Sequence, residues 1–408
     1  MHISSSEVDL MTKYRIPFNR PSLTGDELHY IADAIAQGHI SGDGAFTKKC
    51  HALLKETLNA ADILLTTSCT HALEIAALLL DIQPGDEFIV PSFTFVSTVN
   101  AFVLRGARPV FVDIRPDTLN LDEKLVEQAI THATRLIVPV HYAGVGCEMD
   151  VLMEIANTHN LNVVEDNAHG LFGSYKGKPL GTFGAMATQS FHETKNIVCG
   201  EGGALVINEP HYLERAEIIR EKGTNRSRFL RGQVDKYTWV DIGSSYLPSD
   251  ILAAFLYAQL EKREMIQKSR AQIWRHYIEE LSDWATTYGI GLPTVPDDCE
   301  QPSHMFYLLM PSPEVRRHLK DHLDARGILA VSHYVPLHSS EMGRAYGGYE
   351  GQCPVTERVS ECLLRLPFFT DMSAEEQNVV ISAIHEFEVG STHGADRQSS
   401  EHFLLGSR

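Results

Sequence analysis

An acidic and a basic side chain, those of Asp166 and Lys195, stand at or just beyond the ends of apolar, strand-like segments of this sequence. Asp166 ends the segment 163–166, and Lys195 follows the segment 186–191. A carboxylate at the inner end of a buried strand is costly unless it meets a cation or several donors, so Asp166 is a candidate helix cap, metal ligand or partner of a protonated pyridine nitrogen. An ammonium group in such a place is poorly solvated, so the pKa of Lys195 should fall, and a neutral lysine can form a Schiff base with an aldehyde. Most loop lysines are simply solvated, so the pair needs further support.

A hydroxyl-rich segment and an aromatic residue lie at two other strand ends. Ser68, Cys69 and Thr70 precede an apolar helical pattern, where they can cap the helix and present donors to a phosphate group; an ordinary N-cap is the alternative. Phe95 could stack on a flat heteroaromatic ring, and packing in the core is the alternative.

These four features belong together because ligands of open α/β sheets bind beyond the carboxyl ends of the strands. A phosphate loop, a stacking aromatic, a buried carboxylate and a lysine match the parts that pyridoxal phosphate needs. The GxGxxG and Walker A motifs are missing, which disfavours a Rossmann dehydrogenase or an NTP site. His192 begins a pattern similar to HExxH, but Asn196 stands where the second His is needed, so no metal site is predicted.

The elements that must position these residues alternate between strands and helices from about residue 60 to 220. Continuous apolar segments predict buried strands at 63–67, 88–91, 109–114, 136–141, 163–166, 186–191 and 204–207. Helical spacing is found between them at 72–80, 96–104, 121–130 and 151–157. This alternation predicts an α/β unit whose mostly parallel sheet is covered on both faces.

A second unit is predicted after residue 250. Two helices are expected at 251–267 and 268–281, followed by strands and helices at 305–310, 330–333, 315–326 and 374–386. We therefore divide the chain into an N-terminal extension (1–13), a large cofactor-binding α/β domain (14–250), a small C-terminal α+β domain (251–389) and a polar tail (390–408) that is expected to be flexible.

The overall charge excludes some classes of partner. The 408 residues carry 53 acidic against 35 basic side chains, a formal net charge of −18, which repels nucleic acid and anionic membranes. Seven cysteines are scattered without a CxxC pair, and no signal peptide or membrane-spanning apolar run is found. We expect a cytoplasmic protein that acts on small molecules.

The sequence from about residue 16 to 387 resembles a known family, the DegT/DnrJ/EryC1/StrS sugar aminotransferases. The resemblance is carried by Pro84-Gly85-Asp86-Glu87, Pro91-x-x-Thr94-Phe95, Gly106-Ala107-x-Pro109-Val110, Glu165-Asp166-x-Ala168-His169, Ser190-Phe191-His192-x-x-Lys195 and Gly200-Glu201-Gly202-Gly203. It implies the fold of aspartate aminotransferase, that is, fold type I of the pyridoxal-phosphate enzymes.

Further segments resemble one subgroup of that family, which aminates C4 of TDP-4-keto-6-deoxyglucose. They are 41–44, 221–227, 232–239 and 241–246. The subgroup implies L-glutamate as the amino donor and TDP-4-amino-4,6-dideoxygalactose and 2-oxoglutarate as products, with the cofactor passing through pyridoxamine phosphate. It also implies a homodimer or larger homo-oligomer whose active sites are built from two chains.

The resemblance assigns roles to individual residues. Lys195 is the imine lysine and the acid and base of the reaction, and Asp166 faces the pyridine nitrogen. His169 lies near the ring hydroxyl and Phe95 stacks on the ring. The phosphate is surrounded by Ser68, Cys69, Thr70 and Ser190. Much of the family has Asn where this chain has Ser245, and that Asn reaches the phosphate in the neighbouring subunit; Ser is shorter.

Two further segments are candidates for binding the sugar nucleotide. Lys222 and Arg226 begin a basic stretch that could meet a diphosphate, and a solvated surface loop is the alternative. Tyr334 and His338 match a loop that lies near the active site in the family, and a structural turn explains them equally well.

Other functions within and beyond the family remain open at this point. A sugar 3-dehydratase would have His in place of Lys195. A sugar-nucleotide 3-aminotransferase would use the same residues on another carbon. A non-catalytic sensor that binds pyridoxal phosphate would carry a DNA-binding module, and the sequence has neither an added domain nor a basic helix.

Overall fold

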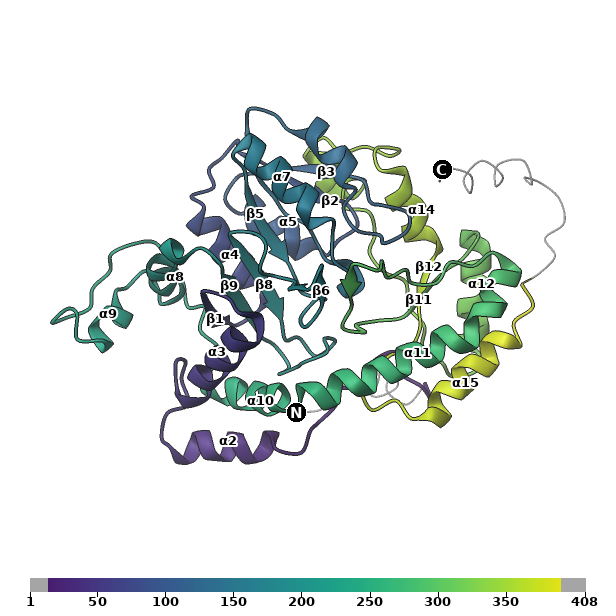
Figure 1. Ribbon diagram of the computed structural model, residues 1–408, viewed down its shortest axis with the longest axis horizontal. Coiled ribbons are helices and arrows are strands. Elements are labelled where there is room, and N and C mark those ends of the chain that lie inside the picture. Colours follow the sequence, from purple (N-terminus) through teal and green to yellow (C-terminus); the bar gives the residue numbers. More distant parts are fainter. Residues whose placement is uncertain (1–13, 390–408) are drawn as a thin grey trace.

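A seven-stranded sheet forms the centre of the larger unit in the computed structural model, which describes residues 14–389 (Figure 1). The strand order is β1-β9-β8-β5-β4-β2-β3, and only β9 is antiparallel to its neighbours. The strands are β1 (Asp62–Thr66), β2 (Glu87–Pro91), β3 (Arg108–Val112), β4 (Thr134–Ile137), β5 (Asn162–Asp166), β8 (Met186–Ser190) and β9 (Gly203–Ile207). All seven predicted strands are present, and the predicted mostly parallel α/β sheet is confirmed.

Helices cover both faces of this sheet because successive strand residues point in opposite directions. Leu64 and Leu205 face the helices α4 (Cys69–Leu79), α5 (Val96–Val103) and α8 (Leu213–Arg220). Their neighbours Ile63 and Val206 face α3 (Ala45–Leu58) and α10 (Asp250–Glu261). Farther along this second face, Val163 packs with α7 (Met149–His159) and α6 (Glu123–Val126). A sheet buried on both sides explains why its strands read as continuous apolar runs.

One predicted boundary between helices was wrong. The sequence predicted helices at 251–267 and 268–281, whereas α10 ends at Glu261 and the 26-residue α11 extends over Arg263–Tyr288, with a break at Lys262. Leu260 packs on the large sheet, while Tyr277 packs in the core of the second unit. The apolar periodicity continues through the break, so it could not reveal where the helix changes direction.

The second unit is built around α11 and a small two-stranded sheet of β11 (Tyr307–Leu309) and β12 (Leu363–Arg365). Its core contains apolar residues of α12 (Pro313–Asp324) and α15 (Ala374–His385), and also Ile16, which pairs with Ile328. The strand predicted at 330–333 does not form. Val331 makes only an isolated bridge to Arg365, and Tyr334 has a positive φ of 41° that turns the chain away.

Several short elements complete the described part of the chain. They are α2 (Glu27–Ala36), α9 (Arg226–Leu230), α13 (Glu341–Ala345), α14 (Pro354–Cys362), β6 (Ser174–Tyr175), β7 (Lys178–Pro179), β10 (Cys299–Glu300) and the 3-10 helices Glu127–Ala129, Tyr142–Gly144 and Pro210–Tyr212. Within residues 14–389, no helix combines the length and the apolar character that crossing a membrane requires. The predicted N-terminal extension (1–13) and the flexible tail (390–408) lie outside the described residues.

Candidate active site

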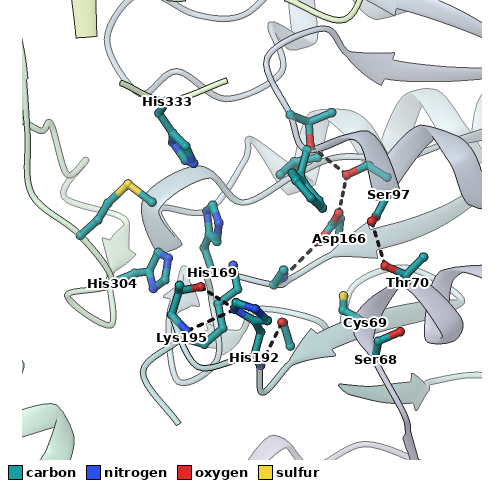
Figure 2. Close-up of a pocket in the computed structure, with 18 of the residues that line it drawn as sticks. Ser68, Cys69, Thr70, Ser97, Asp166, His169, His192, Lys195, His304 and His333 are labelled. Atoms are coloured by element: carbon teal, nitrogen blue, oxygen red, sulfur yellow. Dashed lines mark hydrogen bonds between the residues drawn. The ribbon is translucent and has the colours of Figure 1, made fainter. Parts of the chain in front are cut away.

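A cavity of about 580 Å³ opens at the carboxyl ends of the parallel strands. The sheet contributes Asp166 from the end of β5 and Ser190 from the end of β8, and the second unit contributes His304 and Arg365. Figure 2 shows Ser68, Cys69 and Thr70 on one side and His304 and His333 on the other, with Asp166, His169 and Lys195 between them. The cavity is therefore where the position of the strand ends predicts a ligand site.

Asp166 is a buried carboxylate without a cationic partner. Its Oδ2 accepts a hydrogen bond from Thr98 Oγ1 at 2.7 Å, and its Oδ1 accepts one from the Ala168 amide at 3.2 Å. No ion pair joins Asp166 to a basic side chain of residues 14–389. A protonated heterocyclic nitrogen is a cation of the right kind for this position, because it would offset the cost of the buried charge.

Lys195 lies in the turn that follows β8. Its amide donates to the His192 carbonyl at 2.9 Å, which fixes the turn, and its side chain lines the cavity. Desolvation lowers the pKa of Lys195 to about 8, while the nearby carboxylate of Asp166 acts in the opposite direction. A substantial fraction of this amine is therefore neutral near physiological pH and is able to attack an aldehyde.

The N-terminus of α4 forms one end of the cavity. Ser68 caps the helix by accepting a hydrogen bond from the His71 amide at 3.1 Å, and it also lines the cavity. Its role as an N-cap is therefore compatible with a role in binding a ligand. The first amides of an 11-residue helix have no partners inside the helix and can bind an anion. A Cβ at Gly203 would lie 2.3 Å from the Cys69 nitrogen, so only glycine lets β9 pass behind this loop.

Two aromatic side chains of the cavity, those of His169 and Phe95, remain available to contact a ligand. His169 is buried and its Nδ1 has no hydrogen-bond partner, while its Nε2 is 3.4 Å from the Tyr334 hydroxyl. Burial lowers the pKa of His169 well below its usual value, so the imidazole is neutral and can serve a ring hydroxyl. Phe95 is 57% exposed and lines the cavity, which excludes core packing as its role. Together with Asp166 and α4, these groups fit pyridoxal phosphate.

A second wall of the cavity was missed by sequence reasoning. His304, His333 and Arg365 come from three separate segments of the second unit, and no spacing in the sequence connects them. His304 stacks on His169 with ring centroids 4.3 Å apart, and its Nδ1 is 2.9 Å from Asn196 Oδ1. The signal nearest to this wall was the 333–338 segment, from which Tyr334 was singled out and does line the cavity.

Four of the predicted binding residues do not reach the cavity of their own chain. Lys222 and Arg226 both contact Glu221, at 3.0 and 3.2 Å, and Ser245 is exposed beside the same residue. His338 is fully buried, with Ser92 Oγ 2.6 Å from Nδ1 and Glu357 Oε1 2.7 Å from Nε2. The structure thus corrects the substrate-binding prediction for His338, because both ring nitrogens are used inside the protein.

Metal ligation has no support in the part of the chain that the structure describes. No group of three or more His, Cys, Asp or Glu side chains is arranged to hold an ion there.

Comparisons with known proteins agree with this reading of the cavity. Residues 21–385 match the model of the DegT/DnrJ/EryC1/StrS aminotransferase family. GDP-perosamine synthase of Escherichia coli O157:H7 is 31% identical over 376 residues, covering 91% of this chain and 98% of that protein. A candidate sugar aminotransferase from Streptococcus pneumoniae, solved in its PMP form, superposes with a TM-score of 0.84 at 27% identity and covers 91% of this chain and 98% of its own. DesV of S. venezuelae superposes with a TM-score of 0.83 at 32% identity, with the same coverage.

Proposed function

Because the chain belongs to the DegT/DnrJ/EryC1/StrS aminotransferase family and is a pyridoxal-phosphate-dependent sugar aminotransferase, we propose that it moves an amino group from L-glutamate to C4 of a TDP-4-keto-6-deoxyhexose. The products of this reaction are TDP-4-amino-4,6-dideoxygalactose and 2-oxoglutarate. The observation that carries the chemistry is a lysine with a lowered pKa and a cation-free carboxylate on the walls of one cavity.

The residues of the cavity divide the work of amino transfer. When bound, pyridoxal phosphate supplies the ring that accepts the electrons of the donor's broken C–H bond. Asp166 would hold a proton on the ring nitrogen, and the N-terminus of α4 would hold the phosphate. Lys195 would anchor the cofactor and would then carry a proton from the donor's α-carbon to the cofactor. With the keto sugar as substrate, the same amine would carry a proton from the cofactor to the sugar carbon that receives the amino group.

The choice of a C4 aminotransferase is supported by the subgroup-like segments, which meet in one place although they are far apart in sequence. Asp43 pairs with Arg220 at 2.6 Å, Glu221 forms a bridge with Ser245, and a Cβ at Gly42 would lie 2.7 Å from the Leu247 side chain. This region is the base of an arm (residues 224–243, including α9) at the opposite end of the molecule from α12 and α15 (Figure 1). The segments that resemble the subgroup therefore belong to one local structure, which could act on the substrate as a unit.

We further propose that the arm and Ser245 complete the active site of a second copy of this chain. The arm exposes a set of apolar side chains: Phe229, Leu230, Tyr237, Trp239, Val240 and Ile242. Trp239 alone is 77% exposed, and several exposed apolar side chains on one short segment are typical of a surface that another protein covers. In such a homodimer Lys222 and Arg226, far from their own cavity, would be placed to meet the diphosphate in the partner's cavity.

A cytoplasmic location is part of the same proposal. All seven cysteines are free thiols, and six of them are buried. A chain with this many unpaired thiols suits a reducing compartment, which is also where nucleotide sugars would be supplied.

The deciding experiment is incubation of the holoenzyme with glutamate and TDP-4-keto-6-deoxyglucose, followed by mass spectrometry and NMR of the sugar. We expect an amine at C4, formed in step with 2-oxoglutarate. An amine at C3 would identify the 3-aminotransferase instead, and a cofactor-bound protein that converts no keto sugar would favour the sensor.

A GDP-linked keto sugar is the second candidate acceptor, because one relative at 31% identity is a GDP-perosamine synthase. The same assay with GDP- and TDP-linked substrates at equal concentrations compares the two. A higher kcat/KM for the GDP sugar would replace the TDP assignment and leave the aminotransferase assignment unchanged.

A further inference from the structure

His304 lies in the wall that the second unit contributes to the cavity, and both its backbone and its ring are fixed. Its carbonyl accepts a hydrogen bond from the buried Arg270 at 2.6 Å, and its ring stacks on His169 with centroids 4.3 Å apart. Its Nδ1 lies 2.9 Å from Oδ1 of Asn196, the residue that follows Lys195. The imidazole is therefore tied to the turn that carries the reacting amine.

The hydrogen bonds of Asn196 decide which ring nitrogen of His304 carries the proton. Asn196 Nδ2 donates to the Pro302 carbonyl at 2.6 Å and to Gln267 Oε1 at 3.2 Å, so the amide oxygen faces His304 and can only accept. The Nδ1 of His304 must then be the donor. Desolvation lowers the pKa of His304 well below its usual value, so the ring is neutral and its Nε2 carries a lone pair instead of a proton.

The Nε2 of His304 is an acceptor without a donor. No side chain or amide of residues 14–389 donates a hydrogen bond to it, and it stays accessible from the cavity that His304 lines. His333, in the same wall, is different: its Nδ1 lies 2.8 Å from the Tyr142 hydroxyl, which can donate or accept, so its tautomer is not fixed. His304 therefore presents the cavity with an atom that requires a donor from a ligand.

The substrates of amino transfer to a keto sugar offer few donors to such an atom. Carboxylate and keto oxygens are acceptors only and cannot pair with an unprotonated Nε2. The amino group is taken up by the cofactor, and the donors of the nucleotide lie beyond the diphosphate. The hydroxyls of the sugar remain. Next to a keto carbon at C4, C5 carries the methyl group and the ring oxygen, and C3 carries a hydroxyl.

We propose, resting on the aminotransferase function above, that Nε2 of His304 accepts a hydrogen bond from the sugar hydroxyl next to the carbon that receives the amino group. The charge of Lys195 contributes to the lowered pKa of His304, so the two side chains lie close together in the cavity. The hydroxyl on the neighbouring carbon is the one nearest to the carbon at which Lys195 acts. A sugar without this hydroxyl would leave Nε2 desolvated and unpaired, which makes His304 a determinant of specificity.

The test compares two acceptors that differ by one hydroxyl: TDP-4-keto-6-deoxyglucose and its analogue without the C3 hydroxyl, TDP-4-keto-3,6-dideoxyglucose. The wild-type holoenzyme should use the first with a kcat/KM that is about 10- to 100-fold higher. In His304→Asn the kcat/KM for the first should fall by a similar factor, while that for the analogue stays within about twofold. Equal losses with both acceptors would overturn the proposal.

Two variants separate binding of the hydroxyl from support of the Lys195 turn. His304→Asn places an amide nitrogen near the position of Nδ1, so the bond to Asn196 is kept and the acceptor is lost. His304→Gln places an amide oxygen near the position of Nε2, so the acceptor is kept and the bond to Asn196 is lost. We expect His304→Gln to retain more of the preference for the C3 hydroxyl. The reverse order would show that His304 acts only through Asn196 and would overturn the proposal.

The donor half-reaction and a second histidine provide controls. In single turnovers with glutamate and no sugar nucleotide, His304→Asn should stay within about twofold of the wild type, because glutamate has no hydroxyl to offer. A large loss there would assign Nε2 to the amine of Lys195 instead of the sugar. The Nε2 of His276 also lies 2.9 Å from an asparagine Oδ1, that of Asn378, but His276 does not line the cavity. His276→Asn should leave both acceptors unaffected.

A binding measurement gives a readout that needs no turnover. The pyridoxamine form cannot react with an amino sugar, so calorimetry yields the dissociation constants of TDP-4-amino-4,6-dideoxygalactose and its 3-deoxy analogue. His304→Asn should raise the first constant about tenfold and leave the second unchanged. An unchanged first constant would overturn the role of His304. Failure of the proposed function is distinct, because a wild-type enzyme that aminates neither TDP- nor GDP-linked keto sugars would show it before any variant is made.

Discussion

The cations of the cavity and those of the arm differ in what surrounds them. Lys222, at the base of the arm, and Arg226, Arg228 and Arg231 on it fall within ten residues of sequence, and each lies within 3.2 Å of a glutamate oxygen. Lys195 and Arg365 stand alone in their local sequence and form no ion pair with any described residue.

This difference explains why charge density along the sequence is a poor guide to chemistry. A partly exposed cation with a carboxylate partner is stabilised already, so its surroundings do not drive it to give up a proton. A cation in a desolvated cavity without a partner either gives up its proton, as Lys195 tends to, or stays charged and attracts an anion. The predictions below test that contrast.

The largest effect is expected at Lys195. Lys195→Ala removes the amine that anchors the cofactor and transfers the proton, so the rate of the glutamate half-reaction should fall by about 10⁴-fold. Lys222→Ala, the matched change at the base of the arm, should leave that half-reaction within about twofold because Lys222 is exposed and paired. Similar losses of rate for both variants in single-turnover measurements would contradict the distinction between unpaired cations in the cavity and paired cations at the arm.

Asp166→Asn should have the next largest effect. The amide keeps the shape and can still accept from Thr98, but it no longer compensates a positive ring nitrogen. We expect the donor half-reaction to slow roughly 10²- to 10³-fold while the cofactor remains bound. Absorption titrations of the bound cofactor report its protonation, and a wild-type protonation profile in the variant would contradict the assigned role.

The pH dependence of Lys195 gives a third test. Desolvation favours the neutral form, so the amine is neutral above its pKa of about 8 and its reactivity should rise about tenfold per pH unit below that value and then level off. The measurement is borohydride trapping of an aldehyde on cofactor-free protein, with each modified peptide quantified by mass spectrometry. Exposed lysines in the same sample should keep gaining reactivity toward about pH 10.4. A midpoint near that value at Lys195 would show that its environment is ordinary.

Arg226→Ala tests whether the arm acts on a second copy of the chain. We expect KM for the sugar nucleotide to rise about tenfold with KM for glutamate unchanged, because Arg226 is remote from its own cavity. Mixing Arg226→Ala with Lys195→Ala chains should restore a fraction of sites with normal KM if each site uses both chains. Equal changes for the two substrates would remove the diphosphate role.

The smallest effect on chemistry is expected at His338. His338→Ala leaves the partners Ser92 and Glu357 without their hydrogen bonds in a fully buried position, so the free energy of unfolding should fall by about 2–4 kcal/mol. Denaturant titrations measure this, and kcat and both KM values should stay near those of the wild type below the unfolding transition. A raised KM with unchanged stability would return His338 to the substrate site.

Much of the fold and the first cavity wall could be predicted from local patterns. Strands buried on both faces read as apolar runs, and Asp166, Ser190 and Lys195 stand at or just after such runs. The break at Lys262 could not be predicted, because helical periodicity continues on both sides of it. The strand expected at 330–333 does not form, also because of tertiary structure. A strand needs a neighbouring strand to pair with, and in this segment only Val331 makes a bridge.

The sequence by itself indicated the parallel sheet, the positions of the residues at its strand ends and hence the cofactor chemistry, because the local pattern of apolar and polar residues marks each buried strand and the point where it ends. Only the tertiary structure decided which cations are compensated and which are not. It brought Arg365, His304 and His333 from three segments to face Lys195, and it buried His338 against Glu357. The energy of a charge depends on the distance to other charges and to water, and those distances are set by the packing of the two units.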